Sequence, residues 1–396
     1  MRPPSNAAAS KRSRVDPFRA MHVLAAANAR EAAGESVLHM EVGEPGERLP
    51  AVVRDAIVHA LDHAPLGYTE ALGIKALRRG IAELYRDWYG CTLEPERIAV
   101  TVGASGAFVL SLLAAFDAGA RIGVGEPGYP PYKTMVRALD LAPVMLRTQP
   151  MHGFQPTPED VAVAAPLDGL IVASPANPTG TMLEGVARQK LLAACRARGI
   201  RVIMDEIYHG LVFEGGETTV AAEAPEAIVV NSFSKLFGLT GWRIGWVVLP
   251  TDLVEPVEKL AQNLFIAPPA IAQHAALAVL QHRAVFEGRR QRYRANWQRL
   301  AAALEASGLD GSAIVKAAGA FYLYADMAGF TEDSMAFCGR MLAETGVAAT
   351  PGIDFDAGRG HHYVRFSVAG TDHDIEEAAK RLGTWLPGQR RNRPGG

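Results

Sequence analysis

The chain contains little cysteine, little net charge and no long hydrophobic run. Its three cysteines, Cys91, Cys195 and Cys338, are widely separated and show no metal-ligand spacing, so we expect free thiols and no metal site. A formal net charge of −2 gives no reason to expect nucleic acid or an anionic membrane as a partner. No apolar stretch has the length of a membrane span or of a signal peptide. These absences favour a globular protein of the reducing cytoplasm.

Length and composition predict more than one domain. A chain of 396 residues is too long for one simple core, and 49% hydrophobic with 21% charged residues is ordinary for a globular enzyme. We find no internal repeat. Both ends are polar, basic and rich in proline or glycine, which predicts disorder over residues 1–14 and 387–396.

Seven short apolar runs alternate with helical stretches and predict a mostly parallel sheet covered by helices. The runs lie at residues 98–102, 121–124, 142–146, 169–173, 201–204, 227–230 and 244–249. Strict alternation is lost toward the C-terminus, where strand-like runs at 313–327 and 363–370 predict a smaller α+β domain. We assign residues 47–290 to a large domain and 291–386 to the smaller one, which the N-terminal segment 15–46 joins.

Lys235 directly follows one of these buried runs, in the stretch 231–235. Burial between apolar neighbours lowers the pKa of a lysine and makes it an amine nucleophile that can form a Schiff base with an aldehyde. Ser232 and Ser234 supply hydroxyls nearby, and Arg243 supplies a guanidinium suited to phosphate. An amine of this kind beside an anion-binding cluster suggests pyridoxal 5′-phosphate (PLP). The alternative is a solvated loop lysine.

Ligands of parallel sheets bind where strands end, so the residues after the other runs are candidates as well. After 98–102, Ser105 opens a helix whose N-terminus either binds an anion or is simply capped by that serine. After 121–124, Tyr129 in a proline-rich loop either stacks on a heteroaromatic ring or packs the turn.

Two further strand ends carry Asn177 and Asp205. Asn177, flanked by prolines, either donates its amide to a ring oxygen or makes an Asx turn. Asp205 ends a buried run, where a carboxylate requires a cationic partner, either a protonated pyridine nitrogen or an arginine of the protein. Tyr208, three residues further on, is placed to reach the phenolic oxygen of the same ring.

Arg365 stands inside the apolar run 363–370, where an unpaired cation would be costly. Its partner should be a carboxylate, either of a protein side chain or of an amino-acid substrate held by two hydrogen bonds. Gly43 follows the short extended run 37–42 and permits either a turn or a close backbone approach to a ligand.

Together these residues resemble the class I/II aminotransferases, PLP-dependent enzymes of fold type I that include aspartate aminotransferase. The resemblance covers about Val15 to Leu386. It rests on four motifs in the family's order and spacing, which are Ser174–Gly180, Asp205–Tyr208, Ser232–Lys235 and Gly241–Gly245. It implies an α/β fold in which a large domain with a mostly parallel seven-stranded sheet is joined to a smaller α+β domain.

The resemblance also implies a role for each candidate that binds the cofactor. Lys235 holds PLP as a Schiff base and then moves the proton between substrate and cofactor, and Asp205 pairs with the pyridinium. Asn177 and Tyr208 bind the ring oxygen, and Tyr129 stacks on the ring. Lys235, Asp205 and Tyr208 form the implied catalytic set. The residues implied to hold the phosphate are Ala104, Ser105, Ser232, Ser234 and Arg243.

For the substrate, the resemblance implies that Gly43, Asn177 and Arg365 bind the amino acid. Tyr68 is similar to the tyrosine that the family donates across a dimer interface to the neighbour's phosphate, so a homodimer is implied. The family's reaction is amino transfer between an L-amino acid and a 2-oxo acid.

Two alternatives and one departure accompany this resemblance. PLP-dependent β-elimination, as in C–S lyases, would use the same lysine, aspartate and arginine. A transcription regulator on this fold would need a DNA-binding module, and the roughly forty residues before Gly43 contain no helix-turn-helix pattern. Ile353–Asp354 replaces the small residues usual in relatives after Pro351–Gly352. This change either alters the pocket beside Arg365 or is a loop variant.

Overall fold

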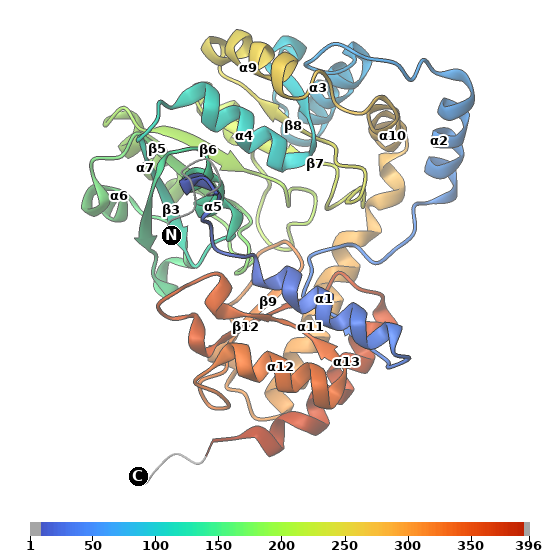
Figure 1. Cartoon of the computed structure of the whole chain (residues 1–396), viewed down its shortest axis with the longest axis vertical. Coiled ribbons are helices and arrows are strands. Elements are labelled where there is room, and N and C mark those ends of the chain that lie inside the picture. The colour runs from blue at the N-terminus through green and yellow to red at the C-terminus, as the bar shows by residue number, and fades with distance from the viewer. Residues whose placement is uncertain (1–8, 392–396) are drawn as a thin grey trace, which may run out of the picture.

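The computed structural model describes residues 9–391, which form two lobes with the N-terminal helix α1 (Arg19–Ala32) at their junction (Figure 1). Residues 1–8 and 392–396, which are parts of the two ends predicted to be disordered, lie outside the described residues. A short 3-10 helix, Lys11–Ser13, lies in the first of those ends, and another, Leu386–Gln389, extends into the second.

The large lobe is built around a seven-stranded sheet in the order β2-β8-β7-β6-β5-β3-β4. Its strands are β2 (Ile98–Thr101), β3 (Arg121–Glu126), β4 (Ala142–Arg147), β5 (Gly169–Ala173), β6 (Arg201–Asp205), β7 (Ile228–Ser232) and β8 (Gly245–Val248). Strand β8 is antiparallel to both of its neighbours, and the other pairs are parallel. Each predicted run forms a strand of this sheet, which confirms the predicted α/β fold.

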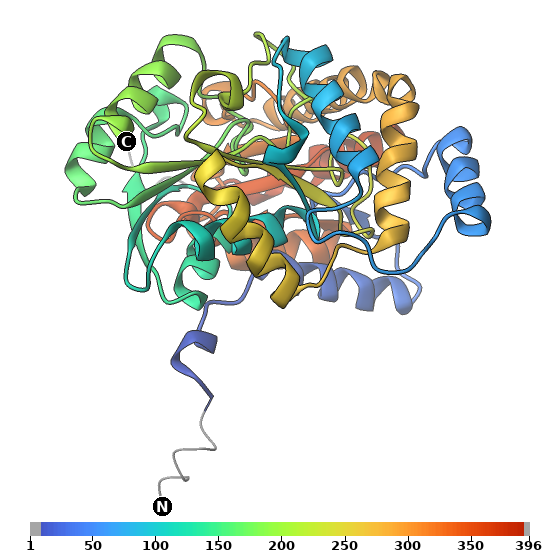
Figure 2. The same ribbon diagram turned by 90° about the horizontal axis from the view of Figure 1, so that it is seen from above.

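Helices cover both faces of the sheet because its strands are apolar on both sides. In β5, for example, Leu170 and Val172 join one hydrophobic core and Ile171 joins the other. Figure 2 shows the sheet between its two layers of helices, with α2 at the edge of the lobe. The helices of this lobe are α2 (Ala51–His63), α3 (Lys75–Tyr89), α4 (Gly103–Ala115), α5 (Pro131–Ala138), α6 (Pro158–Ala164), α7 (Gly185–Arg196), α8 (Val220–Glu223), α9 (Thr251–Leu264) and α10 (Ala270–Gln281).

The small lobe contains an antiparallel sheet in the order β11-β12-β9 and a parallel pair, β1-β10. The β1–β10 pairing attaches the N-terminal segment to this lobe. Its strands and helices, besides α1, are β1 (Leu38–His39), β9 (Tyr322–Asp326), β10 (Val347–Ala348), β11 (Thr350–Pro351), β12 (Tyr363–Ser367), α11 (Gly288–Ala306), α12 (Ser334–Thr345) and α13 (Asp372–Trp385).

The prediction of a strand over 313–327 is wrong in its first part, because β9 begins at Tyr322. The backbone N–H groups of Ala318 and Gly319 donate to the carbonyl of Gly180 in the large lobe, at 2.9 and 3.0 Å. Ala320 then takes a left-handed conformation with a φ of 63°. These tertiary contacts turn the chain before the strand starts, and the local apolar pattern does not contain them.

Within residues 9–391, no helix combines the length and the apolar character needed to cross a membrane.

Candidate active site

A cavity of about 220 Å³ is lined by residues from both lobes. Parallel strands bring their carboxyl ends to one edge of the sheet, so the residues that follow β3, β5, β6 and β7 meet there. The predicted site residues in the wall of the cavity are Gly43, Ala104, Ser105, Tyr129, Asn177, Asp205, Tyr208, Ser234, Lys235, Arg243 and Arg365. Ser232 and Tyr68 are the predicted site residues that do not line it.

The Lys235 amine donates a hydrogen bond to the carbonyl of Gly43 at 2.8 Å. Burial lowers the pKa of Lys235 to about 8, and the positive charge of Arg365 acts in the same direction. Gly43 has to be a glycine here, because a Cβ on it would come within 1.8 Å of the Tyr322 hydroxyl oxygen. The site therefore contains an amine that is partly unprotonated near neutral pH, which is the condition for nucleophilic attack on an aldehyde.

Asp205 ends β6 and is 4% exposed. Its Oδ2 accepts a hydrogen bond from the Tyr132 hydroxyl at 2.5 Å, and its Oδ1 accepts one from the backbone N–H of Ile207 at 3.0 Å. Burial raises the pKa of Asp205 to about 6, and these two hydrogen bonds oppose that rise. Within residues 9–391, no side chain forms an ion pair with this carboxylate. Asp205 is therefore suited to a cation supplied by a ligand.

The N-terminus of α4 forms another part of the wall, with Ala104 and Ser105 in its first turn. Val102 occupies the N-cap position and no side chain among residues 9–391 caps the helix, so Ser105 does not act as the cap. The free N–H groups and the helix dipole favour an anion at this position. A Cβ on Gly103 would come within 2.5 Å of Arg243 Nη2, so the glycine allows the guanidinium to approach the helix start.

Ser234 lines the cavity, whereas Ser232 lies behind it. The Ser232 Oγ is 2.9 Å from the Ser234 Oγ and 3.0 Å from the carbonyl oxygen of Ile244. The Ser234 backbone N–H donates to the Ser232 Oγ at 3.0 Å. Ser232 thus fixes the position of Ser234, and Ser234 presents its hydroxyl on the same wall as Arg243.

Tyr129 and Tyr208 form aromatic walls. The ring of Tyr129 is held edge-on by Phe18, with ring centroids 5.9 Å apart, and by Tyr132, with centroids 5.3 Å apart. Tyr208 is 4% exposed, and its hydroxyl oxygen is 2.9 Å from that of Tyr322. Each ring is therefore fixed by a second aromatic residue before any ligand binds.

Arg365 is 2% exposed and its guanidinium carbon lies 4.4 Å from the ring centroid of Tyr322 and 4.8 Å from that of Phe355. Its Nη1 donates to Asn177 Oδ1 at 3.0 Å, and its Nη2 donates to Thr350 Oγ1 at 3.0 Å and to the Glu41 carbonyl. The buried Nε has no hydrogen-bond partner among the described residues. No protein carboxylate within residues 9–391 pairs with this cation, so a ligand carboxylate would satisfy it.

Tyr68 lies in the loop between α2 and α3 and is 87% exposed. Among the described residues, it is not one of those that line the cavity.

Residues that the sequence did not single out complete the wall. Tyr132 and Tyr322 contact predicted residues directly, and Phe18, Ala20 and Met21 close the cavity from the start of α1. The local signal for Tyr132 is its place in the same proline-rich loop as Tyr129, three residues further on. Nothing local marks the others.

Comparison with known proteins identifies the class of enzyme. Residues 35–382 match the sequence model of the family aminotransferase class I and II. The chain belongs to this family and is a PLP-dependent aminotransferase. The match confirms the resemblance noted from the motifs of the sequence.

The names of individual relatives refer to different substrates. The chain is 44% identical over 383 residues to a valine–pyruvate aminotransferase of Mycobacterium tuberculosis, covering 96% of this chain and 98% of that protein. It is 33% identical over 356 residues to an aspartate/prephenate aminotransferase of Thermus thermophilus, covering 88% and 91%. A crystal structure of an aminotransferase from M. tuberculosis matches with a TM-score of 0.92 at 43% identity, covering 96% of this chain and 100% of that one. Aspartate aminotransferase from T. thermophilus with maleate matches with a TM-score of 0.89 at 32% identity, covering 95% and 99%.

The cavity fits PLP on two observations. Asp205 is a buried carboxylate without an ion-pair partner in the described chain, as a pyridinium nitrogen requires. The uncapped start of α4, with Arg243 beside it, offers the donors that a phosphate group requires.

Proposed function

We propose that this aminotransferase moves the amino group of a neutral, aliphatic L-amino acid to a small 2-oxo acid such as pyruvate. One observation carries the proposal. The wall of the cavity contains two arginines within the described residues, Arg243 and Arg365, and each already has an anion to bind in the proposed site. A dicarboxylate substrate would need a further cation for its side chain.

The rest of the lining supports the same choice. The N-terminal segment lines the cavity with the apolar side chains of Phe18, Ala20, Met21 and Val42, and its charged lining residues, Glu41 and Glu44, are both acidic. An aliphatic side chain gains free energy by leaving water against such a surface, and a second carboxylate would lose it. The similarity to a valine–pyruvate aminotransferase over nearly the whole chain supports a donor and acceptor of this size.

Each cofactor-binding side chain has a distinct proposed task. Lys235 provides the amine that links to the cofactor and, once free, holds and moves the proton at the substrate Cα. Asp205 binds the pyridine nitrogen, while Asn177 and Tyr208 bind the ring oxygen and Tyr129 covers the ring face. PLP, when bound, supplies an electron sink that stabilises negative charge at the substrate Cα.

The proposed phosphate site is the start of α4 with Ala104 and Ser105, together with Ser234, Ser232 behind it, and Arg243. Arg365 and the backbone of Gly43 hold the substrate carboxylate, and Asn177 assists through its bond to Arg365. Fixing the carboxylate fixes the rotation about the bond from nitrogen to Cα, so the chain selects which Cα bond reacts.

We propose a homodimer in which Tyr68 reaches the neighbouring site. Exposed apolar side chains on α2 and in the loop that carries Tyr68 support this, because Val58, Leu61 and Leu66 are between 43% and 50% exposed. We also propose a cytoplasmic location, since all three cysteines are buried free thiols.

A donor screen tests the substrate assignment. Purified enzyme loaded with PLP is assayed with alanine, valine, leucine, aspartate and glutamate against pyruvate and against 2-oxoglutarate, except for alanine with pyruvate and glutamate with 2-oxoglutarate, whose products are the reactants. We expect kcat/KM for valine to exceed that for aspartate by about 100-fold or more, because the aspartate side chain would leave an unpaired carboxylate in an apolar site. A preference for aspartate or glutamate would refute the aliphatic assignment and leave the family assignment intact.

A further inference from the structure

Asp354 binds the first turn of a helix from a distant part of the chain. Helix α1 has Phe18 at its N-cap position and no side-chain cap of its own. The backbone N–H of Arg19 donates to Asp354 Oδ1, and that of Ala20 donates to Asp354 Oδ2, both at 3.2 Å. Asp354 is 4% exposed and lies in the 3-10 helix Gly352–Asp354. Its carboxylate therefore replaces the cap that the local sequence lacks.

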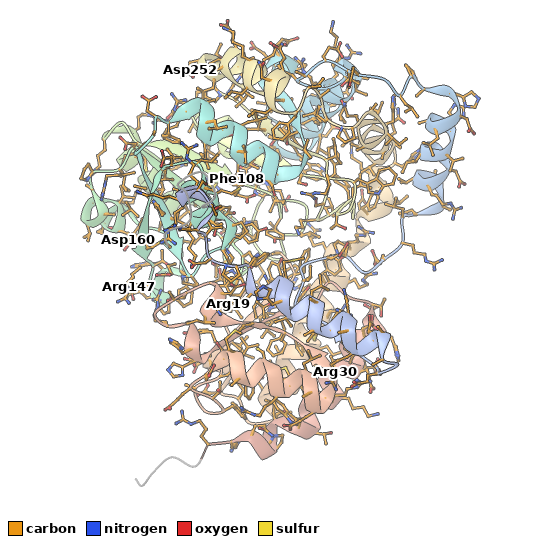
Figure 3. All side chains as sticks on the ribbon, viewed as in Figure 1. Arg19, Arg30, Phe108, Arg147, Asp160 and Asp252 are labelled. Carbon is orange, nitrogen blue, oxygen red and sulfur yellow. The ribbon has the colours of Figure 1, made fainter. Side chains whose placement is uncertain are left out.

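The start of α1 is also a wall of the active-site cavity. Phe18, Ala20 and Met21 line the cavity, and Phe18 packs edge-on against Tyr129. Figure 3 labels Arg19 at the end of α1 that lies at the junction of the lobes, and Arg30 at the opposite end over the small lobe. One end of the helix thus faces the active-site cavity, and the other end lies at the protein surface.

The far end of α1 is attached independently of Asp354. His39 Nδ1 is 2.7 Å from Glu41 Oε1, and His39 Nε2 is 3.3 Å from Glu31 Oε2 on the helix. The hydrogen bond with Glu41 raises the pKa of His39 to about 9, so this link is charged near neutral pH. Arg30 Nη2 also donates to the carbonyl of Ala343 at 3.1 Å. Removing the Asp354 carboxylate should therefore loosen the first turn and leave the rest of the helix in place.

The orientation of the substrate follows from two of its groups, the α-carboxylate and the amino group, which the proposed site holds. With the α-carboxylate on Arg365 and the amino group at Lys235, the side chain of the donor has to face the remaining lining. That lining includes the apolar residues at the start of α1. A methyl side chain is too short to depend strongly on this wall, whereas a branched or longer chain packs against it.

We propose that Asp354 is a positioning residue for substrate selection, because it fixes the wall of α1 against which the donor side chain packs. This inference rests on the proposed aliphatic donor. It gives a physical role to the departure expected at Ile353–Asp354, because Asp354 places a buried carboxylate against the first turn of α1. Asp354 does not touch the reacting atoms and acts through the N–H groups of Arg19 and Ala20.

The test compares Asp354→Ala and Asp354→Asn with a matched control, Glu31→Gln, which cuts the link at the opposite end of α1. Single-turnover reactions of the PLP-loaded enzymes are measured with alanine, 2-aminobutyrate, valine and leucine. In Asp354→Ala we expect the valine-to-alanine ratio of kcat/KM to fall by about 10-fold, since the lost packing amounts to one or two methyl groups. The loss should lie mainly in the donor's dissociation constant that these single-turnover reactions yield, with alanine changed by less than about 3-fold. Asp354→Asn keeps one acceptor oxygen and should be intermediate, and Glu31→Gln should retain the wild-type ratio.

Amide hydrogen exchange provides a readout that does not depend on turnover. In the holoenzyme without substrate, the amides of Arg19 and Ala20 should exchange faster in Asp354→Ala than in the wild type, while amides in the last turn of α1 should not change. An equal loss for every donor, an unchanged ratio, or unchanged exchange at Arg19 and Ala20 would overturn the proposal. If Asp354→Ala fails to fold, Asp354→Asn decides by the same criteria. A wild-type enzyme that prefers dicarboxylates would refute the aliphatic assignment, and the exchange data would still report whether Asp354 orders the start of α1.

Discussion

The Tyr132 hydroxyl donates a 2.5 Å hydrogen bond to Oδ2 of Asp205 at the end of β6. Both side chains are buried, with 5% and 4% of their surfaces exposed. Because Asp205 has no ion-pair partner in the described chain, Tyr132 and the Ile207 N–H are the donors that orient its carboxylate before the cofactor binds. Through this bond, Tyr132 orients the Asp205 carboxylate for its proposed contact with the pyridine nitrogen.

Replacing Tyr132 by Phe should lower kcat by about 10-fold, because a hydrogen bond to a charged acceptor stabilises it by about 1.5 kcal/mol. The measurement is kcat at saturating donor, with bound PLP quantified from the visible spectrum. Tyr324→Phe is the control, since the Tyr324 hydroxyl is buried and has no hydrogen-bond partner among the described residues. Equal effects of the two substitutions would mean that the Tyr132–Asp205 bond does not contribute to catalysis.

The lowered pKa of Lys235 predicts how cofactor capture depends on pH. Burial and the charge of Arg365 lower this pKa from the ordinary lysine value to about 8. The unprotonated amine attacks the aldehyde, so the rate of PLP capture by the apoenzyme should rise with pH through about 8 and level off above about 9. Stopped-flow absorbance across this pH range measures the rate.

Lys235→Ala is the control for this pH profile. This variant should have no turnover, and borohydride should no longer fix the cofactor covalently to the chain. A capture rate that continues to rise up to about pH 10.5 would show that Lys235 titrates as an ordinary exposed lysine. Normal turnover of Lys235→Ala would refute the assignment of this residue altogether.

The sequence predicts the strand-end residues well because their meeting point follows from topology. Asp205 and Lys235 each come directly after a buried run, and parallel strands bring such positions together whatever the details of packing. The sequence marks Asp354 as a departure but does not show its contact with α1, and it does not show the bond between Tyr132 and Asp205, because these contacts join segments 335 and 73 residues apart along the chain. The prediction of a strand over 313–327 is wrong in its first part for the same reason, because Ala318 and Gly319 donate hydrogen bonds to the carbonyl of Gly180 in the other lobe.

Tyr68 gives a prediction about assembly. If it reaches the phosphate of a neighbouring subunit, Tyr68→Phe should weaken PLP binding by about 10-fold, since it removes one hydrogen bond to a charged group. Val163→Ala on α6 is the control, because Val163 is 89% exposed and Tyr68 is 87% exposed. Sedimentation should show the mass of a dimer for the wild type, as expected for a homodimer of two-fold symmetry. A fully active monomer, or equal PLP affinity in the two variants, would make Tyr68 an ordinary surface residue.

Arg365→Lys separates substrate binding from structural support. The substitution keeps the positive charge but loses the planar fork that bonds Asn177 and Thr350 and leaves Nε free for a ligand. We expect kcat/KM to fall on the order of 100-fold for every α-amino acid, because hydrogen bonds to the substrate carboxylate are lost. Primary amines without a carboxylate should change by less than about 3-fold, since they never made these bonds. Steady-state kinetics with both kinds of donor and the visible spectrum of bound PLP provide the measurement.

The control for this substitution is Arg381→Lys on α13, which makes the same change at an arginine that bonds Glu377 outside the cavity. It should leave both kinds of donor and PLP binding unchanged. Because no protein carboxylate in the described chain pairs with Arg365, loss of the fork should leave the fold and the cofactor in place and act on the substrate carboxylate. If Arg365→Lys instead loses PLP or unfolds, while the surviving protein uses amino acids normally, the guanidinium is a support for Glu41, Asn177 and Thr350. The carboxylate site would then have to be sought elsewhere in the cavity wall.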